Sequence, residues 1–257
     1  MKNPPAISKI HLTLLVLFLS LLVVLPYGSQ ILTASQQTTD RKLPVYCVQT
    51  DQKQISLTFD AAWNDTDLAD ILQILKEKEV RATFFMTGDW IENYPDAVKQ
   101  IAAAGHDLGN HGDNHAHMNA LSQAQCEAEI QGAHQKVKDL TGVDMNLFRP
   151  PYGEYNNTVL AAADSCQYYT IQWDVDSLDW KDYGVSDIIS RVSNHKHLGN
   201  GSIILLHNGA KYTKDALAEL IDQLKDKGYT FVPVSELIYK QDYTIDHEGR
   251  QHPSKAQ

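Results

Sequence analysis

The sequence has few cysteines and no concentration of basic residues. So few cysteines, with no C-x-x-C pair among them, exclude a fold held together mainly by disulfides. The net charge of −10 and the lack of a basic stripe exclude a protein that follows the phosphates of a nucleic acid. One disulfide remains possible, with a pairing that the sequence does not determine, among Cys47, Cys126 and Cys166.

The first 33 residues have the pattern of a targeting segment. Two lysines precede a mainly apolar run from residue 12 to residue 25. A positive region followed by an apolar region at the N-terminus predicts export of the rest of the chain. The stretch 32–34 matches a small-x-small cleavage site poorly. Residues 1–33 are therefore interpreted either as a cleaved signal peptide or as an uncleaved membrane anchor.

Beyond this segment, the 257-residue chain is long enough for one large α/β domain. Residues 34–50 are polar and irregular, which predicts a linker, and residues 241–257 are interpreted as a polar tail. Between them, in residues 51–240, short apolar strands alternate with amphipathic helices, a pattern typical of a parallel sheet with helices outside. The predicted strands cover 55–60, 82–87, 106–110, 168–175, 202–207 and 230–234, with a short one ending at 148. The predicted helices cover 67–78, 95–104, 122–140, 156–163, 186–197 and 215–227.

Unusual polar residues stand at or just after the C-terminal ends of these predicted strands. They are Asp60, His111, Arg149, Asp176 and His207. In a β/α barrel the C-terminal ends of the strands meet at one mouth. The sequence therefore predicts an α/β fold, a distorted (β/α) barrel of about seven strands, rather than an open doubly wound sheet.

The stretch GNHGDNHAH contains a pair of histidines at i, i+4 spacing, His111 and His115. Histidines that converge in a tight turn can bind a divalent metal, although an exposed histidine-rich loop has the same pattern. An H-E-x-x-H metallopeptidase site is excluded, because position 112 is glycine and supplies no base. His106 and His117 are weaker candidates without an assigned role.

Three further candidates have a structural alternative. Asp60 is either a helix cap or a general base. Arg149 precedes two prolines, which keep it extended, and it is either part of a surface turn or the partner of a buried carboxylate. His207 ends the most apolar strand of the domain and needs a hydrogen-bond partner. We expect Asp176 to be that partner.

These candidate residues lie in five short motifs, and the motifs and their order along the chain resemble those of the polysaccharide deacetylase family. This family is carbohydrate esterase family 4, with the NodB-homology domain. The likeness spans about residues 55–207 and is greatest to the sporulation and cell-wall branch. Any single motif is weak, whereas five in the family's order are specific. They are Thr58-Phe59-Asp60, His111-x-x-x-His115, Arg149-Pro-Pro-Tyr152-Gly, Asp176-Ser-Leu-Asp179-Trp180 and Leu205-Leu206-His207.

The resemblance implies hydrolysis of the N-acetyl group of an amino sugar. Asp60 would be the general base, and His111 and His115 would hold a divalent metal, usually zinc, that polarises the amide carbonyl. The backbone N–H of Tyr152 would help to bind the oxyanion.

The remaining motif residues would complete the reaction. His207 would be the general acid, oriented and charged by Asp176. Arg149 would keep the base ionised. Leu205 and Trp180 would shape an apolar slot for the acetyl methyl group.

The sequence departs from the family at Ala61, where the family carries an aspartate as the third metal ligand. Loss of a residue that only hydrogen-bonds to a metal ligand lowers metal affinity ~10–100-fold. Loss of a ligand itself should lower the affinity by at least as much. Three outcomes are open: a weakened site completed by water, a substitute ligand, or an empty and inactive site. The substitutes in reach are Asn64, Asp65 and Asp113.

Taken together, these observations predict an exported, metal-dependent enzyme that removes N-acetyl groups from peptidoglycan or a chitin-like polysaccharide. The alternative is a catalytically weak or inactive glycan-binding protein of the cell wall on the same fold. The expected location is outside the cytoplasm, either anchored in the membrane or secreted to the cell wall.

Overall fold

The computed structural model describes residues 41–254. Residues 43–254 belong to one compact unit. The predicted targeting segment, residues 1–33, lies outside the described residues. Within residues 41–254, no helix combines the length and the apolar character that crossing a membrane requires.

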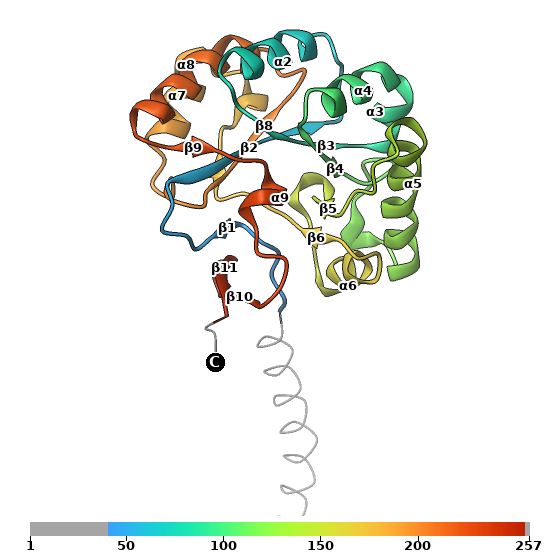
Figure 1. The fold of residues 1–257 in the computed structure, drawn as a ribbon. Coiled ribbons are helices and arrows are strands. Elements are labelled where there is room, and N and C mark those ends of the chain that lie inside the picture. Colours follow the sequence, from blue (N-terminus) through green and yellow to red (C-terminus); the bar gives the residue numbers. More distant parts are fainter. Residues whose placement is uncertain (1–40, 255–257) are drawn as a thin grey trace, which may run out of the picture. The chain divides into compact units, whose positions relative to one another are not determined.

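A curled parallel sheet forms the centre of the unit (Figure 1). Its strands lie in the order β6, β5, β4, β3, β2, β8, β7, and β9 pairs with β2 beyond this path. The two end strands do not pair in the described part of the chain, so the sheet is a half-barrel rather than a closed barrel. The strand bounds are Gln54–Ala61 for β2, Thr83–Met86 for β3, Asp107–Asn110 for β4, Leu147–Phe148 for β5, Tyr169–Thr170 for β6, Val175–Asp176 for β7, Ile203–His207 for β8 and Thr230–Phe231 for β9.

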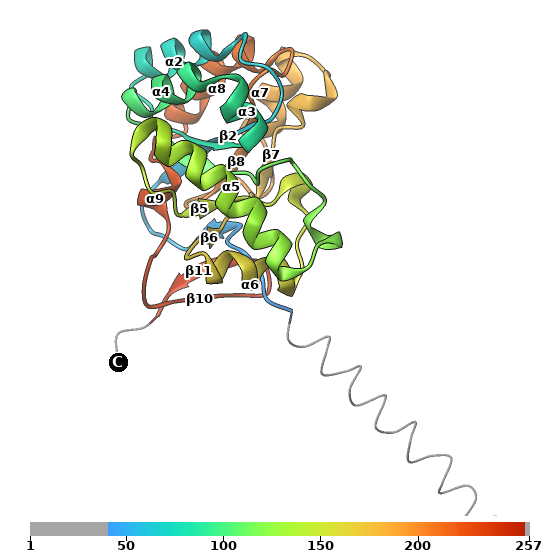
Figure 2. The same cartoon turned by 90° about the vertical axis from the view of Figure 1, so that its right-hand side faces the viewer.

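Helices cover the outer side of this sheet (Figures 1 and 2). Each predicted helix is present within a few residues of its expected bounds, and α3 was not predicted. The bounds are Leu68–Glu77 for α2, Gly88–Asn93 for α3, Pro95–Ala103 for α4, Gln123–Thr141 for α5, Asn157–Ser165 for α6, Val185–Ser193 for α7, Thr213–Asp226 for α8 and Val234–Leu237 for α9. Short 3-10 turns are η1 (Met118–Ala120), η2 (Pro151–Gly153) and η3 (Asp179–Lys181).

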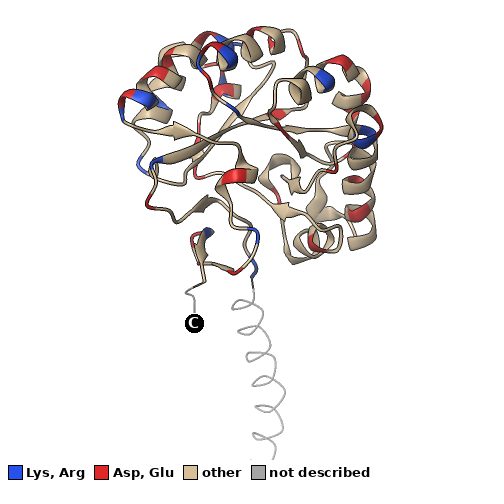
Figure 3. Ribbon diagram, in the orientation of Figure 1, with Lys and Arg blue, Asp and Glu red and all other residues tan. Residues whose placement is uncertain are grey.

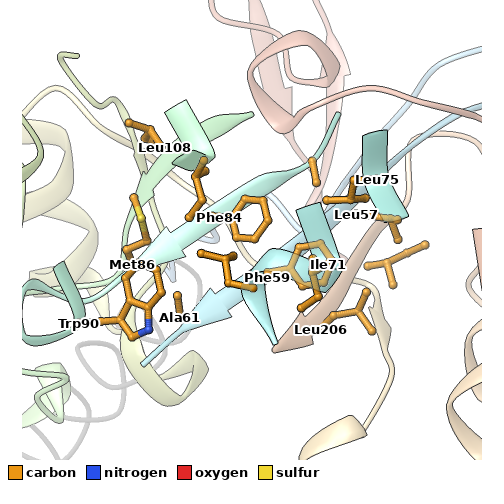
Figure 4. Close-up of a cluster of buried hydrophobic side chains, with 14 of the residues drawn as sticks. Leu57, Phe59, Ala61, Ile71, Leu75, Phe84, Met86, Trp90, Leu108 and Leu206 are labelled. Atoms are coloured by element: carbon orange, nitrogen blue, oxygen red, sulfur yellow. The ribbon is translucent and has the colours of Figure 1, made fainter. Parts of the chain in front are cut away.

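Side-chain alternation along β2 separates the core from the site. Leu57, Phe59 and Ala61 are fully buried in the apolar cluster under the helices (Figure 4). Because successive side chains of a strand point to opposite faces, Thr58 and Asp60 lie on the other face, inside the curl of the sheet. The core thus fixes the direction in which Asp60 points.

Helix α5 shows how local sequence sets the bounds of an element. Ser122 accepts a hydrogen bond from the Gln125 amide, and the Gln125 side chain accepts one from the Ser122 amide, which is a capping box. Gly142 ends the helix with a left-handed backbone (φ 74°) that glycine adopts without strain.

The prediction that residues 241–257 form a polar tail is wrong for the described residues, because they include two strands. The chain returns as the hairpin β10 (Tyr243–Ile245) and β11 (Arg250–Pro253), and β11 pairs in parallel with β1 (Cys47–Val48). This three-stranded sheet also places β1 inside the segment predicted to be a linker. The polar side chains hid the hairpin, because buried Gln251 is held by hydrogen bonds to Tyr239 rather than by apolar packing.

The predicted strand 168–175 is also shorter than expected. It is replaced by the two-residue strands β6 and β7 with an irregular stretch between them.

In Figure 3 basic residues lie scattered among acidic ones on the ribbon, as the absence of a basic stripe predicts.

Candidate active site

Adjacent strands bring the predicted acid and base together. Asp60 at the end of β2 is the register partner of His207 at the end of β8, and neighbouring strands lie about 4.8 Å apart. β4 and β5 continue the sheet and end just before His111 and Arg149. These four predicted residues therefore follow four strands at the same end of the sheet.

Asp60 and Arg149 form a buried ion pair. Arg149 Nη1 lies 2.7 Å from Asp60 Oδ1, and Arg149 also donates to Thr58 Oγ1 and to the carbonyl oxygen of Gln172. Burial alone raises the pKa of the Asp60 carboxyl, but the charge of Arg149, together with that of His207 and the hydrogen bond from Arg149, outweighs it and holds the pKa below its ordinary value. Asp60 is therefore ionised at neutral pH, as a general base must be.

The protonation of His111 follows from its partners. Its Nδ1 lies 2.7 Å from the carbonyl oxygen of Arg149, which only accepts, so Nδ1 carries the hydrogen. Burial lowers the pKa of His111 despite the charge of Asp60, so the ring is neutral. The lone pair of Nε2 therefore faces Asp60 Oδ2 across 3.6 Å.

His115 lies beside His111, with ring centroids 5.1 Å apart. Burial, with the neighbouring His111, lowers the pKa of His115 to about 4, so this ring is also neutral at pH 7. The Tyr152 ring lies against the His115 ring, with centroids 4.4 Å apart, and stacks on the His117 ring, with centroids 4.2 Å apart. His117, to which the sequence assigned no role, thus helps to hold Tyr152, whereas His106 accepts a hydrogen bond from the Ala82 amide inside the fold.

His207 is oriented by Asp179, not by Asp176. His207 Nδ1 lies 2.7 Å from Asp179 Oδ1, and Asp179 Oδ2 accepts hydrogen bonds from the His207 amide and from Thr213 Oγ1. The left-handed backbone of Leu178 (φ 50°) turns the chain so that Asp179 points inward. Burial lowers the pKa of His207, but the hydrogen bond and charge of Asp179 outweigh it, and the net pKa is raised.

The other predicted residues surround this centre. Asp176 accepts a hydrogen bond from the Leu178 amide and so holds the turn. Leu205 lies two residues before His207 on β8, while Trp180 is half exposed with Lys181 Nζ over its ring. The acetyl slot formed by Leu205 and Trp180 and the oxyanion role of Tyr152 stay predictions.

The described residues do not fit a three-ligand metal site. The side chains of residues 41–254 contain no group of three His, Cys, Asp or Glu placed to hold an ion. Asp113 does not replace the missing ligand, because it pairs with Lys136 at 2.7 Å and packs against Gly88 and Gly132. Asn64 is committed to its own loop through Thr66. Two neutral imidazoles remain as potential ligands.

Sequence reasoning missed the residue that fixes the histidine loop. Glu129 on α5 accepts hydrogen bonds from the backbone amides of Asp113 and Asn114 and from the Asn114 side chain, at 2.8–2.9 Å. Gly132 and Lys136 follow on the same face of the helix, at the i+3 and i+7 positions. This spacing was the only sequence signal, and it becomes informative only once α5 is known to lie against the loop.

We expect Glu129→Ala to speed amide hydrogen exchange at Asp113 and Asn114 and to lower the free energy of unfolding by about 0.5–1.5 kcal/mol, since two backbone amides at the surface of the fold lose a charged acceptor. Exchange measured by NMR and urea unfolding check this. Glu127→Ala on the same helix is the control, because Glu127 bonds only to the exposed Gln123 side chain. Equal effects of the two substitutions would contradict the role of Glu129.

Comparison with known proteins agrees with this arrangement. Residues 48–171 match the profile of the family described as polysaccharide deacetylase. A peptidoglycan-N-acetylglucosamine deacetylase of Bacillus cereus is 36% identical over 196 residues, which cover 74% of this chain and 91% of that protein. The uncharacterized protein YlxY of Bacillus subtilis is 34% identical over 195 residues, and the match spans 76% of this chain but 60% of YlxY.

Among solved structures, BA3943 of Bacillus anthracis, described as a CE4 family pseudoenzyme, matches with a TM-score of 0.73 and 31% identity. The match covers 81% of this chain and 72% of BA3943. A mutant of BA3943 is described as having restored enzymatic activity. The similar proteins thus include both a deacetylase and a pseudoenzyme.

Proposed function

The chain belongs to the polysaccharide deacetylase family, and from this premise we propose that it removes N-acetyl groups from the amino sugars of a cell-wall polysaccharide. One observation carries the proposal. An ionised carboxylate, Asp60, and a histidine of raised pKa, His207, end neighbouring strands and are register partners. Amide hydrolysis needs such a base and such an acid.

The reaction divides between these two residues. Asp60 takes a proton from water as the water oxygen bonds to the amide carbon. His207 then donates its proton to the amide nitrogen, the carbon–nitrogen bond breaks, and acetate and a free amine leave. Arg149 keeps Asp60 ionised and Asp179 keeps His207 protonated. Because the residues present do not make a three-ligand metal site, no step is assigned to a metal.

Peptidoglycan or a chitin-like glycan is the proposed substrate. It is supported by the activity that names the Bacillus cereus relative, a peptidoglycan-N-acetylglucosamine deacetylase. We also propose that the domain acts outside the cytoplasm, which is supported by the apolar N-terminal pattern of residues 1–33. Acetate release from N-acetylglucosamine oligomers and from purified peptidoglycan tests the activity, with Asp60→Asn as the inactive control. Release no faster than by the control, on every glycan tried, would refute it.

The second candidate is a catalytically weak or inactive glycan-binding protein on this fold. Ala61 favours it, because two imidazoles alone are expected to bind a divalent metal weakly. The description of the similar BA3943 as a pseudoenzyme favours it too.

Ala61 is the last residue of β2 and is buried on the face opposite Asp60, so a carboxylate at this position must turn out of the apolar cluster to reach the histidines. If it does so, we expect Ala61→Asp to bind zinc at least about tenfold more tightly than the wild type and to release acetate faster. Metal content after dialysis against buffered zinc measures this. Ala62→Asp is the matched control, because it adds the same charge one residue further along. Unchanged zinc in Ala61→Asp would show that position 61 is not the reason for a weak site.

A further inference from the structure

Trp63 is an exposed aromatic residue close to the reaction centre. It follows the end of β2 by two residues, and its side chain is 47% exposed. None of the five motif stretches named above includes it. Its ring stacks on the imidazole of His207, with centroids 5.1 Å apart and planes 18° from parallel.

The loop that carries Trp63 is bound to the loop that follows His207. The Asn208 side chain donates to the carbonyl oxygen of Asn64 at 2.6 Å, and the Gly209 amide donates to both carboxylate oxygens of Asp67 at 2.8 and 2.9 Å. Gly209 has a left-handed backbone (φ 77°) that favours glycine. These bonds join the two loops just after Trp63, and the pairing of β2 with β8 holds the chain just before it, so its position relative to His207 is fixed.

Trp63 and Asp179 hold the imidazole of His207 in different ways. Asp179 accepts a hydrogen bond from Nδ1 of His207, and the indole of Trp63 covers one face of the imidazole ring. Nε2 is left as the nitrogen that delivers a proton. A protonated imidazole against an indole face is also favourable electrostatically.

Exposed aromatic residues gather at this end of the sheet. Of the five large hydrophobic side chains exposed in residues 41–254, only Val143 is not aromatic. Trp63, Tyr152 and Trp180 follow the ends of β2, β5 and β7. Single exposed hydrophobic residues need no explanation, but three aromatic rings following strands at one end of a sheet fit a ligand that has both apolar faces and a polar rim. A pyranose ring has this character.

We propose that Trp63 is a substrate-positioning residue: the indole face that is not stacked on His207 receives the apolar face of a pyranose ring and so holds the glycan chain beside the reaction centre. The inference rests on the proposed function for the class of substrate. It adds a contact that lies outside the five motif stretches named above.

Binding measured without turnover tests it. All proteins carry Asp60→Asn, and the probes are the N-acetylglucosamine hexamer and soluble peptidoglycan fragments, titrated by calorimetry. Trp63→Leu keeps an apolar side chain without an aromatic face, and Trp63→Phe restores an aromatic ring. Tyr183→Ala is the control, because Tyr183 is an exposed aromatic with Arg191 as its ring partner. Melting temperatures confirm that each variant is folded.

We expect Trp63→Leu to weaken binding about tenfold, equivalent to about 1.4 kcal/mol, and Trp63→Phe and Tyr183→Ala to stay within about threefold of the parent. The inference is overturned if Trp63→Leu binds like the parent, if Tyr183→Ala loses as much affinity, or if the parent binds neither probe. Loss of binding in Trp63→Leu, beside a wild type that releases no acetate, would support the inference while refuting the proposed activity. Acetate release by the wild type, together with unchanged glycan binding in Trp63→Leu, would support the proposed activity and refute the inference about Trp63.

Discussion

Replacing Arg149 by methionine is expected to lower the free energy of unfolding by about 3–5 kcal/mol at neutral pH, because the buried Asp60 carboxylate is left without its cation. The Arg149 side chain has no exposed surface and that of Asp60 is 6% exposed, so solvent cannot compensate. Urea unfolding of the two proteins measures the difference.

The same substitution should reverse the pH dependence that Asp60 contributes. In the wild type its pKa is lowered by folding, so its contribution to stability is present above the unfolded value of about 4 and is lost only as pH falls through the lower folded value. In Arg149→Met burial dominates and raises the pKa of Asp60. The folded variant then keeps a proton that the unfolded chain releases, so its stability falls as pH rises above about 4. The deficit against wild type should therefore be larger at pH 7 than at pH 4.

Arg81→Met provides the control for this experiment. Arg81 also pairs with a carboxylate, that of Glu236 at 2.6 Å, but the two side chains are 51% and 45% exposed. Exposed pairs contribute about 0–1 kcal/mol, so Arg81→Met should be nearly neutral. If Arg149→Met were as mild as Arg81→Met, or if its deficit did not grow with pH, the buried pair would not have the role described.

Asp179→Asn is expected to reduce acetate release by about 10²–10⁴-fold, since the amide cannot stabilise a protonated His207. The pKa of His207, followed by NMR, should fall. The pairing with Asp179 raises that pKa, so its contribution to stability is present below the unfolded value of about 6.5 and is lost as pH rises through the folded value. In Asp179→Asn this loss of stability with rising pH should shrink.

Asp176→Asn separates the two aspartates of the motif. Asp176 accepts one backbone hydrogen bond, from Leu178, which an asparagine oxygen can also accept. We expect its acetate release to stay within about tenfold of wild type, in keeping with an indirect role. A greater loss in Asp176→Asn than in Asp179→Asn would restore the assignment made from the sequence. In a wild type too slow to assay, the pKa of His207 alone decides between them.

The sequence predicted what depends on periodicity. Alternation in β2 and the capped, apolar-striped helices are local patterns, and they were sufficient to place Asp60, His111, Arg149 and His207 at one end of a parallel sheet. The number of about seven strands followed from the same reasoning, whereas the order of the strands in the sheet was not predicted. The interpretation of residues 1–33 as a cleaved signal peptide or an uncleaved membrane anchor stays a prediction.

Side-chain partnerships were harder to predict, because they depend on turns and long-range packing. The left-handed residue Leu178 decides that Asp179, rather than Asp176, reaches His207, and a leucine does not signal such a turn. Glu129 acts across an interface between α5 and a loop. The hairpin of β10 and β11 is stabilised by hydrogen bonds from polar side chains, so its hydropathy resembles that of a tail.

This hairpin also has a consequence for how the protein folds. Parallel pairing of β1 with β11 joins the two ends of the domain, and Arg250 lies 202 residues along the chain from Val48, to whose carbonyl oxygen it donates. Contacts between such distant residues form late, because the intervening chain must first be closed into a loop. During synthesis from the N-terminus, β1 therefore has no partner strand in this sheet until residues 250–253 emerge. Completion of this three-stranded sheet must await residues 243–253.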